Sequence, residues 1–399
     1  MRHSIVLLFF FCFSLAYSYA QTTSEKVGVI QNFSLNSNHL GEQRNIEVYL
    51  PPSYETTKEK SYPVMYVLDG QEYFLHPVTY QRMLRFKDKT PEFIVVGISS
   101  DRRKRRKLYY EDAQKFIGFL KEELIPQVDQ KYRTLKEKER SFLGWEMAAG
   151  LGLEIYTEHP NTFNAFLLSS PTHFTQKRMV ALNESAKNNR LPKAFMYVTK
   201  APEEIYLEKS LLKMDSLLNK HKSTSLDWKI ENLAGEDHYS TSLKTLNNGL
   251  HIHFNDYNTL RFYTLKEYDD FGDLETIKRY YKHRGERYGI SPDVHRTTKH
   301  FLIYNAMKEE NLKRFEMYAQ EFPEYFQHPR LEVWAVRFGD FFAKHNKDKQ
   351  AIETYNAGLR KFPTSSSIHK ALGTYYKNKG NQQLADVHLK KAIEYAKKK

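Results

Sequence analysis

The sequence predicts an α/β fold, a mostly parallel sheet in three layers, followed by an all-α tail of helical repeats. Between about residues 29 and 260, apolar runs alternate with helix-like segments. Several runs are continuously apolar, which is typical of strands buried on both faces. Beyond Asp273 the sequence shows no convincing strand pattern, and aromatic and alanine residues recur at helical spacing. A chain of this length is expected to form two domains.

The elements of the first domain follow from these patterns. Apolar runs predict strands at 45–50, 63–68, 93–98, 141–144, 165–168, 194–198 and 228–233. The segments between them predict helices at 113–127, 147–158, 203–220 and 242–254. Strands that alternate with helices in this way are typical of a three-layer α/β sheet.

The tail contains a repeat with a period of 34 residues. Five positions correspond: Phe338 with Leu372, Gly339 with Gly373, Phe342 with Tyr376, Ala351 with Ala385 and Tyr355 with Leu389. The pattern resembles the tetratricopeptide helix–turn–helix, in which small residues let paired helices pack closely. Residues 294–327 are a candidate for a degenerate earlier repeat. Two functions stay open for the tail, a binding groove for a protein partner or a helical cap on the first domain.

The first 20 residues have the pattern of a signal peptide. Arg2 and His3 precede an apolar run, and Ser18-Tyr19-Ala20 forms a small-x-small cleavage site. We therefore expect an exported protein, periplasmic or secreted, with no membrane span after signal cleavage. The expected domains are a signal peptide at 1–20, an α/β domain at 21–265 and a helical domain at 266–399. The lone Cys12 lies in the signal peptide, so cysteine chemistry is not expected.

The chain is basic, with 61 Lys+Arg against 48 Asp+Glu. For an exported protein this balance is compatible with a polyanionic ligand, but a solvated basic surface accounts for it better, and nucleic acid is not expected as a partner. The densest basic run, residues 101–107, directly follows the predicted strand at 93–98, and strand ends line the ligand crevice of such sheets. Either this run attracts anions to a site, or it is a solvated loop.

Four stretches of the first domain are distinctive. They are Val48-Tyr49-Leu50-Pro51-Pro52-Ser53-Tyr54, Tyr62-Pro63-Val64-Met65-Tyr66-Val67-Leu68-Asp69-Gly70, Ser169-Ser170-Pro171 and Gly235-Glu236-Asp237-His238-Tyr239-Ser240. Together they resemble the putative-esterase family of α/β-hydrolases, which includes trilactone siderophore esterases, feruloyl esterases and S-formylglutathione hydrolase. The resemblance covers roughly residues 29–255, and it implies an α/β-hydrolase fold and a small-molecule ester as ligand.

The resemblance also implies where the catalytic groups lie. In active members, a histidine oriented by an acid deprotonates a serine on a sharp turn between strand and helix, and backbone N–H groups hold the oxyanion. The corresponding turn lies within residues 142–150. The implied positions are Glu146 for the serine, His238 for the histidine, Glu203 or Glu204 for the acid, and the N–H groups of Met147 and Gly70 (or Gln71) for the oxyanion.

Glu146 changes the expected function. A carboxylate can act as a nucleophile on an alkyl carbon, but its attack on an ester carbonyl would give a high-energy anhydride. Ala148 and Ala149 stand where glycines are usual, and the segment between Ile98 and Ala113 is shorter than in active relatives. The sequence therefore favours a catalytically defective pseudo-hydrolase that binds a ligand or partner.

The alternative is an active ester hydrolase that uses Glu146 and His238 in a modified site. Neither function calls for a cofactor. The histidines lack metal-type spacing, and the sequence contains no phosphate-binding glycine loop.

Overall fold

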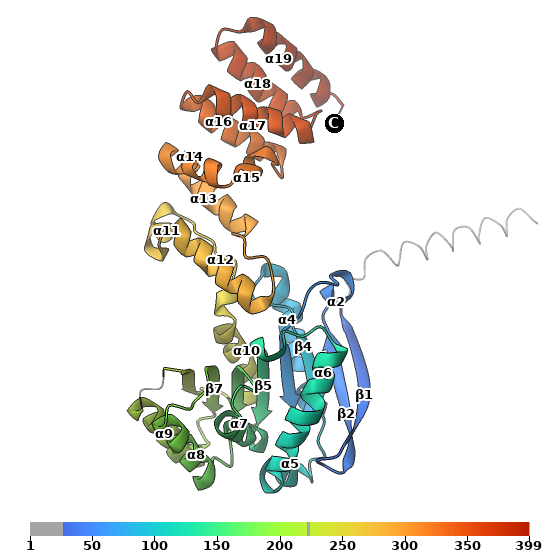
Figure 1. Cartoon of the computed structure of the whole chain (residues 1–399). Coiled ribbons are helices and arrows are strands. Elements are labelled where there is room, and N and C mark those ends of the chain that lie inside the picture. Colours follow the sequence, from blue (N-terminus) through green and yellow to red (C-terminus); the bar gives the residue numbers. More distant parts are fainter. Residues whose placement is uncertain (1–26, 222–223, 399) are drawn as a thin grey trace, which may run out of the picture. The chain divides into compact units, whose positions relative to one another are not determined.

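The computed structural model describes residues 27–221 and 224–398, which form two compact units (Figure 1). The first unit runs to Asn258 and also includes His283–Ser291, whereas the second contains Thr259–Lys282 and the chain from Pro292 onward. The signal peptide expected at 1–20, with Cys12, lies outside the described residues. No helix within residues 27–221 and 224–398 is both long enough and apolar enough to span a bilayer.

The first unit is built on one eight-stranded sheet with the order β1-β2-β4-β3-β5-β6-β7-β8. β2 pairs antiparallel with β1 and with β4, and every other neighbouring pair is parallel. The strands are β1 (Val29–Ser37), β2 (Glu42–Leu50), β3 (Val64–Leu68), β4 (Ile94–Ile98), β5 (Arg140–Trp145), β6 (Ala165–Ser169), β7 (Ala194–Lys200) and β8 (Leu226–Asn232).

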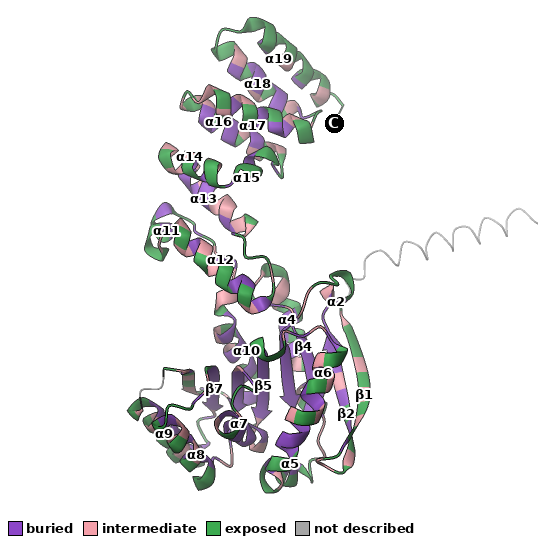
Figure 2. Cartoon of the chain, in the orientation of Figure 1, coloured by how far each residue is buried: buried purple, intermediate pink, exposed green. Residues whose placement is uncertain are grey.

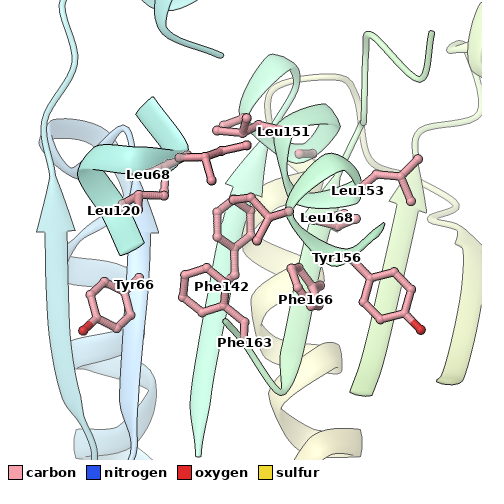
Figure 3. Close-up of a cluster of buried hydrophobic side chains, with 14 of the residues drawn as sticks. Tyr66, Leu68, Leu120, Phe142, Leu151, Leu153, Tyr156, Phe163, Phe166 and Leu168 are labelled. Atoms are coloured by element: carbon pink, nitrogen blue, oxygen red, sulfur yellow. The ribbon is translucent and has the colours of Figure 1, made fainter. Parts of the chain in front are cut away.

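Helices cover both faces of the sheet, so its central strands β3 to β7 are almost wholly buried (Figure 2). One face carries α5 (Ala113–Gly118), α6 (Ile125–Lys131), α7 (Met147–Glu158), α8 (Gln176–Lys187) and α9 (Ile205–Lys220). Its core includes Phe142, Leu151 and Phe166 (Figure 3). The other face carries α4 (Leu75–Leu84) and α10 (Thr241–His253). Short helices α2 (Ser53–Thr56) and α3 (Gly70–Tyr73) complete the unit. The predicted three-layer α/β class is confirmed.

The sequence patterns located most elements of the first unit but missed β1 and the helices α2, α3, α4 and α8. All seven predicted strands are present, and α7 has the predicted bounds. β1 was missed because it is an edge strand whose residues are mostly exposed or half-buried, so it lacks an apolar run. The predicted helix at 113–127 continues to Lys131 through wider π-type turns at Phe119–Leu124, just before Pro126, which has no N–H to donate.

The second unit is helical, as predicted. It contains α11 (Leu265–Phe271), most of α12 (Leu274–Tyr288), α13 (Arg296–Lys308), α14 (Leu312–Glu321), α15 (Pro323–Gln327), α16 (Glu332–Lys344), α17 (Asp348–Lys361), α18 (Ser366–Asn378) and α19 (Gln382–Ala396).

The 34-residue correspondence is visible in the packing of the last four helices. A Cβ on Gly339 would lie 2.4 Å from Tyr355 Cε1, and a Cβ on Gly373 would lie 2.7 Å from Leu389 Cγ. Glycine at both positions therefore lets α16 pack on α17 and α18 pack on α19 at close range.

A buried cluster of charges holds residues 283–291 in the first unit. Glu139, just before β5, is only 2% exposed. It lies 2.5 Å from His253 Nε2 and 2.9 Å from Arg287 Nε. Burial raises the pKa of Glu139, but His253 and Arg287 outweigh burial and hold this pKa at about 2. No local pattern predicts this long-range cluster.

Candidate functional site

Loops from six neighbouring strands meet at the carboxyl edge of the sheet, where ligands bind in open α/β folds. Each loop begins at the carboxyl end of a strand that runs parallel to its neighbours in this part of the sheet, so its first side chains are brought to the same edge. The polar residues so placed are Asp69 after β3, Arg105 after β4, Glu146 after β5, Ser170 after β6, Glu204 after β7 and His238 after β8.

The chain turns sharply between β5 and α7, and Glu146 occupies the turn with φ 57° and ψ −117°. A Cβ on Gly144 would lie 2.7 Å from the carbonyl carbon of Ala148, so glycine is needed for the helix to approach the strand. Ala148 and Ala149 are completely buried, and their methyl groups are accommodated on α7. The positive φ of Glu146 costs a non-glycine residue about 1–3 kcal/mol of stability.

The Glu146 side chain is bound by Arg105. Glu146 Oε2 accepts a hydrogen bond of 2.5 Å from Arg105 Nη1. Arg105 Nη2 donates to Asp69 Oδ2 at 3.0 Å and to the Trp145 carbonyl at 3.2 Å, and Nε donates to Asp69 Oδ1 at 3.1 Å. Burial lowers the pKa of Arg105, but the Asp69 and Glu146 carboxylates outweigh burial and raise this pKa above its ordinary value. Arg105 therefore forms ion pairs with both Asp69 and Glu146. These two residues directly precede Gly70 and Met147, whose N–H groups are the predicted oxyanion donors.

His238 is bound by Glu204. His238 Nδ1 lies 2.6 Å from Glu204 Oε1. Glu204 also accepts hydrogen bonds from Ala201 N at 2.6 Å, Ser170 Oγ at 2.8 Å and the Tyr206 hydroxyl at 3.1 Å. Burial raises the pKa of Glu204, but these hydrogen bonds outweigh it and lower the pKa overall, so the carboxylate is ionised at neutral pH.

Of the two acids that the sequence offered, Glu204 faces the imidazole. Glu203 accepts a hydrogen bond of 3.0 Å from the His238 backbone N–H instead. His238 Nε2 makes no hydrogen bond within the described residues. The histidine is thus oriented as a base would be, with its second nitrogen available.

Glu146 and His238 belong to separate networks. Within residues 27–221 and 224–398, no hydrogen bond or ion pair connects their side chains. The structure brings all the predicted site residues to one edge of the sheet, but it directs the Glu146 carboxylate towards Arg105. Among these described residues there is also no group of three or more His, Cys, Asp or Glu arranged to hold a metal ion.

A pocket of about 420 Å³ opens beside this network. Trp145 lines this pocket; its Nε1 donates to the His238 carbonyl at 2.8 Å, and its ring centroid lies 5.1 Å from the Arg105 guanidinium carbon. The residues that line it are Asp69, Gln71, Glu72, Tyr73, Arg102, Arg105, Trp145 and Tyr239.

The positive charges of the basic run at 101–107 are paired with nearby carboxylates. Each of its six cations lies within 4.0 Å of a carboxylate oxygen: Arg102 of Glu72, Arg103 of Asp101, Lys104 of Glu42, Arg105 of Asp69 and Glu146, Arg106 of Glu111, and Lys107 of Asp112. The run therefore adds little net positive charge at the pocket.

Arg105 and Trp145 are the site residues that sequence reasoning missed. Arg105 was hidden in a run of six cations, and only its burial distinguishes it. Trp145 was recognised only as part of the turn.

Comparisons with known proteins agree with this geometry. Residues 37–242 match the family described as "Putative esterase". YbbA of Bacillus subtilis, described as uncharacterized, is 20% identical over 176 residues, which are 41% of this chain and 70% of YbbA.

Two solved structures share the fold. An IroE-like serine hydrolase from Shewanella oneidensis has a TM-score of 0.56 and 20% identity, with 74% of this chain and 100% of that chain covered. An uncharacterised protein from Capnocytophaga ochracea has a TM-score of 0.63 and 17% identity, with 83% and 94% covered. The family match spans more than half of the chain, and the chain accordingly belongs to the putative-esterase family of α/β-hydrolases.

Proposed function

We propose that this protein is a non-hydrolytic member of the esterase family that acts by binding a ligand in the pocket beside Trp145. The observation that carries the proposal is the binding of Glu146 by Arg105. The serine mechanism requires a nucleophile within about 2.6–3.2 Å of the histidine base. Glu146 has no such contact with His238, and attack by a carboxylate on an ester would give an anhydride.

Hydrolysis of an activated aryl ester, p-nitrophenyl acetate, tests this proposal. We expect the purified full-length protein to show no turnover above the uncatalysed rate, and His238→Ala to behave identically. Robust hydrolysis that His238→Ala abolishes would overturn the proposal.

Glu146→Ser tests why the activity is lost. His238 and Glu204 remain in place, so this variant is expected to gain slight esterase activity. Combining it with His238→Ala provides the matched control, because any activity produced by the serine must then disappear.

An active hydrolase is the second candidate, favoured by the intact pair of His238 and Glu204 at 2.6 Å. It predicts a covalent adduct on Glu146, detectable by mass spectrometry after reaction with the activated ester. The absence of an adduct at any residue would argue against this candidate.

The proposal includes export and a protein partner for the helical unit. Export is supported by the sequence of residues 1–20, and N-terminal sequencing of the mature protein should begin at Gln21. A partner is supported by a groove of about 580 Å³ lined mainly by residues of α16 and α18, among them Lys344 and Lys370.

A further inference from the structure

The charged groups in the wall of the pocket are paired with one another. Asp69 lies 3.0 Å from Arg105, and Glu72 lies 2.6 Å from Arg102. A charged ligand would have to compete with these existing pairs, and it would also lose its own hydration. A neutral ligand avoids both costs. The pocket therefore fits an uncharged ligand, although the chain as a whole is basic.

Three aromatic rings provide flat apolar surfaces in the same pocket. The Trp145 ring centroid lies 6.1 Å from that of Tyr73 and 6.1 Å from that of Tyr239. Trp145 is fixed by its hydrogen bond to the His238 carbonyl, so little freedom is lost when a ligand packs on it. Tyr239 is 75% exposed, and burying its ring on a ligand would be favourable.

The polar groups favour a ligand with hydroxyls over one with an ester carbonyl. A hydroxyl both donates and accepts, so it can bond to the carboxylate and to the guanidinium of an ion pair at once. Gln71, Glu72 and Arg102 supply such groups at the pocket. A carbonyl oxygen only accepts, so it could bond to the guanidinium of such a pair but not to its carboxylate.

We propose that this pocket binds a neutral, polyhydroxylated ring, that is, a carbohydrate unit, which stacks on Trp145 and Tyr239 and shares hydrogen bonds with the Glu72–Arg102 pair. This inference rests on the proposed function, since it takes the site to bind without hydrolysing. The net positive charge of the chain would by itself favour an anionic ligand, whereas the ligand proposed here is neutral.

The purified full-length protein, fluorescently labelled, should be applied to an array that carries neutral, acidic and amino-sugar oligosaccharides. We expect binding to neutral glycans. The affinity for the best of these, measured by titration calorimetry, should fall about tenfold in Tyr239→Ala, because the substitution removes one stacking surface. Arg102→Ala should also weaken binding.

Tyr239 and Arg102 are both strongly exposed, so neither substitution should disturb folding. The matched control is Tyr263→Ala, because Tyr263 is a 60% exposed tyrosine of the second unit. Its binding should equal that of the unaltered protein.

Binding restricted to acidic glycans, binding that Tyr239→Ala leaves unchanged, or no binding to any glycan would each overturn the inference. The ester assay separates this failure from failure of the proposed function. Turnover of p-nitrophenyl acetate refutes the non-hydrolytic site whatever the array shows, whereas absence of both turnover and glycan binding refutes only the carbohydrate ligand.

Discussion

The backbone conformation at Glu146 predicts an unusual order of stability for two substitutions. At φ 57° and ψ −117°, a side chain costs about 1–3 kcal/mol that glycine does not incur. Glycine loses about 0.5–1 kcal/mol more backbone entropy on folding than alanine does. Both Glu146→Ala and Glu146→Gly remove the ion pair with Arg105, so that loss cancels in the comparison. Glu146→Gly should therefore be more stable than Glu146→Ala by about 1 kcal/mol.

Urea unfolding followed by tryptophan fluorescence measures this difference. The chain has three tryptophans, and Trp334 belongs to the second unit. In a Trp334→Phe background, the signal of Trp145 and Trp228 reports on the first unit alone. Lys209, exposed in the middle of α9, provides the control. At this position the order of the two variants should reverse, with Lys209→Ala about 1 kcal/mol more stable than Lys209→Gly. If Glu146→Ala proves as stable as Glu146→Gly, the turn is not strained and the reasoning fails.

Two further predictions concern stability. The pKa of Glu139, about 2 instead of 4.5, corresponds to about 3 kcal/mol of stability that is fully present above pH 4.5 and is lost as the pH falls towards 2. Acid unfolding monitored by the fluorescence of Trp145 and Trp228 in the Trp334→Phe background should show this loss, and a Glu139→Gln variant without a flatter profile over that range would contradict it. Gly339→Ala should destabilise the second unit by about 1–3 kcal/mol because its methyl group meets the Tyr355 ring. Urea unfolding followed by Trp334 fluorescence measures the free energy of unfolding of this unit. The prediction fails if Gly339→Ala lowers this free energy no more than Lys349→Ala, a substitution at an exposed site.

Local patterns were sufficient to predict most of the fold. The buried strands are continuous apolar runs, and α7 is a longer segment of apolar and small residues that directly follows the turn, so each could be located without tertiary contacts. β1 could not be located in this way, because its residues are mostly exposed or half-buried and form no apolar run. Its strand conformation is evident only from its pairing with β2. The return of residues 283–291 to the first unit depends on Arg287 meeting Glu139, a contact between residues 148 positions apart.

The candidate site was predictable as a set of positions but not as a set of contacts. Turn chemistry and the family resemblance gave Glu146 and His238, and both lie at the carboxyl edge of the sheet. Neither signal says which way a carboxylate points. The sequence could not distinguish Glu203 from Glu204, which are adjacent, whereas in the structure only the Glu204 carboxylate contacts the His238 imidazole, at 2.6 Å.

Strain at Glu146 is weak evidence of function, because the surrounding backbone imposes it. Its carbonyl accepts hydrogen bonds from Gly150 N at 3.1 Å and Thr172 N at 3.2 Å. Gly144 lets α7 pack against β5, whatever side chain stands at 146. The turn would therefore persist in a chain that had lost every use for it. The pocket offers a separate observation, since Tyr239 is 75% exposed and its ring centroid lies 6.1 Å from that of Trp145. The proposal that the site binds a ligand therefore depends on these aromatic rings, and the ligand assay tests it more directly than the conformation of the turn at Glu146.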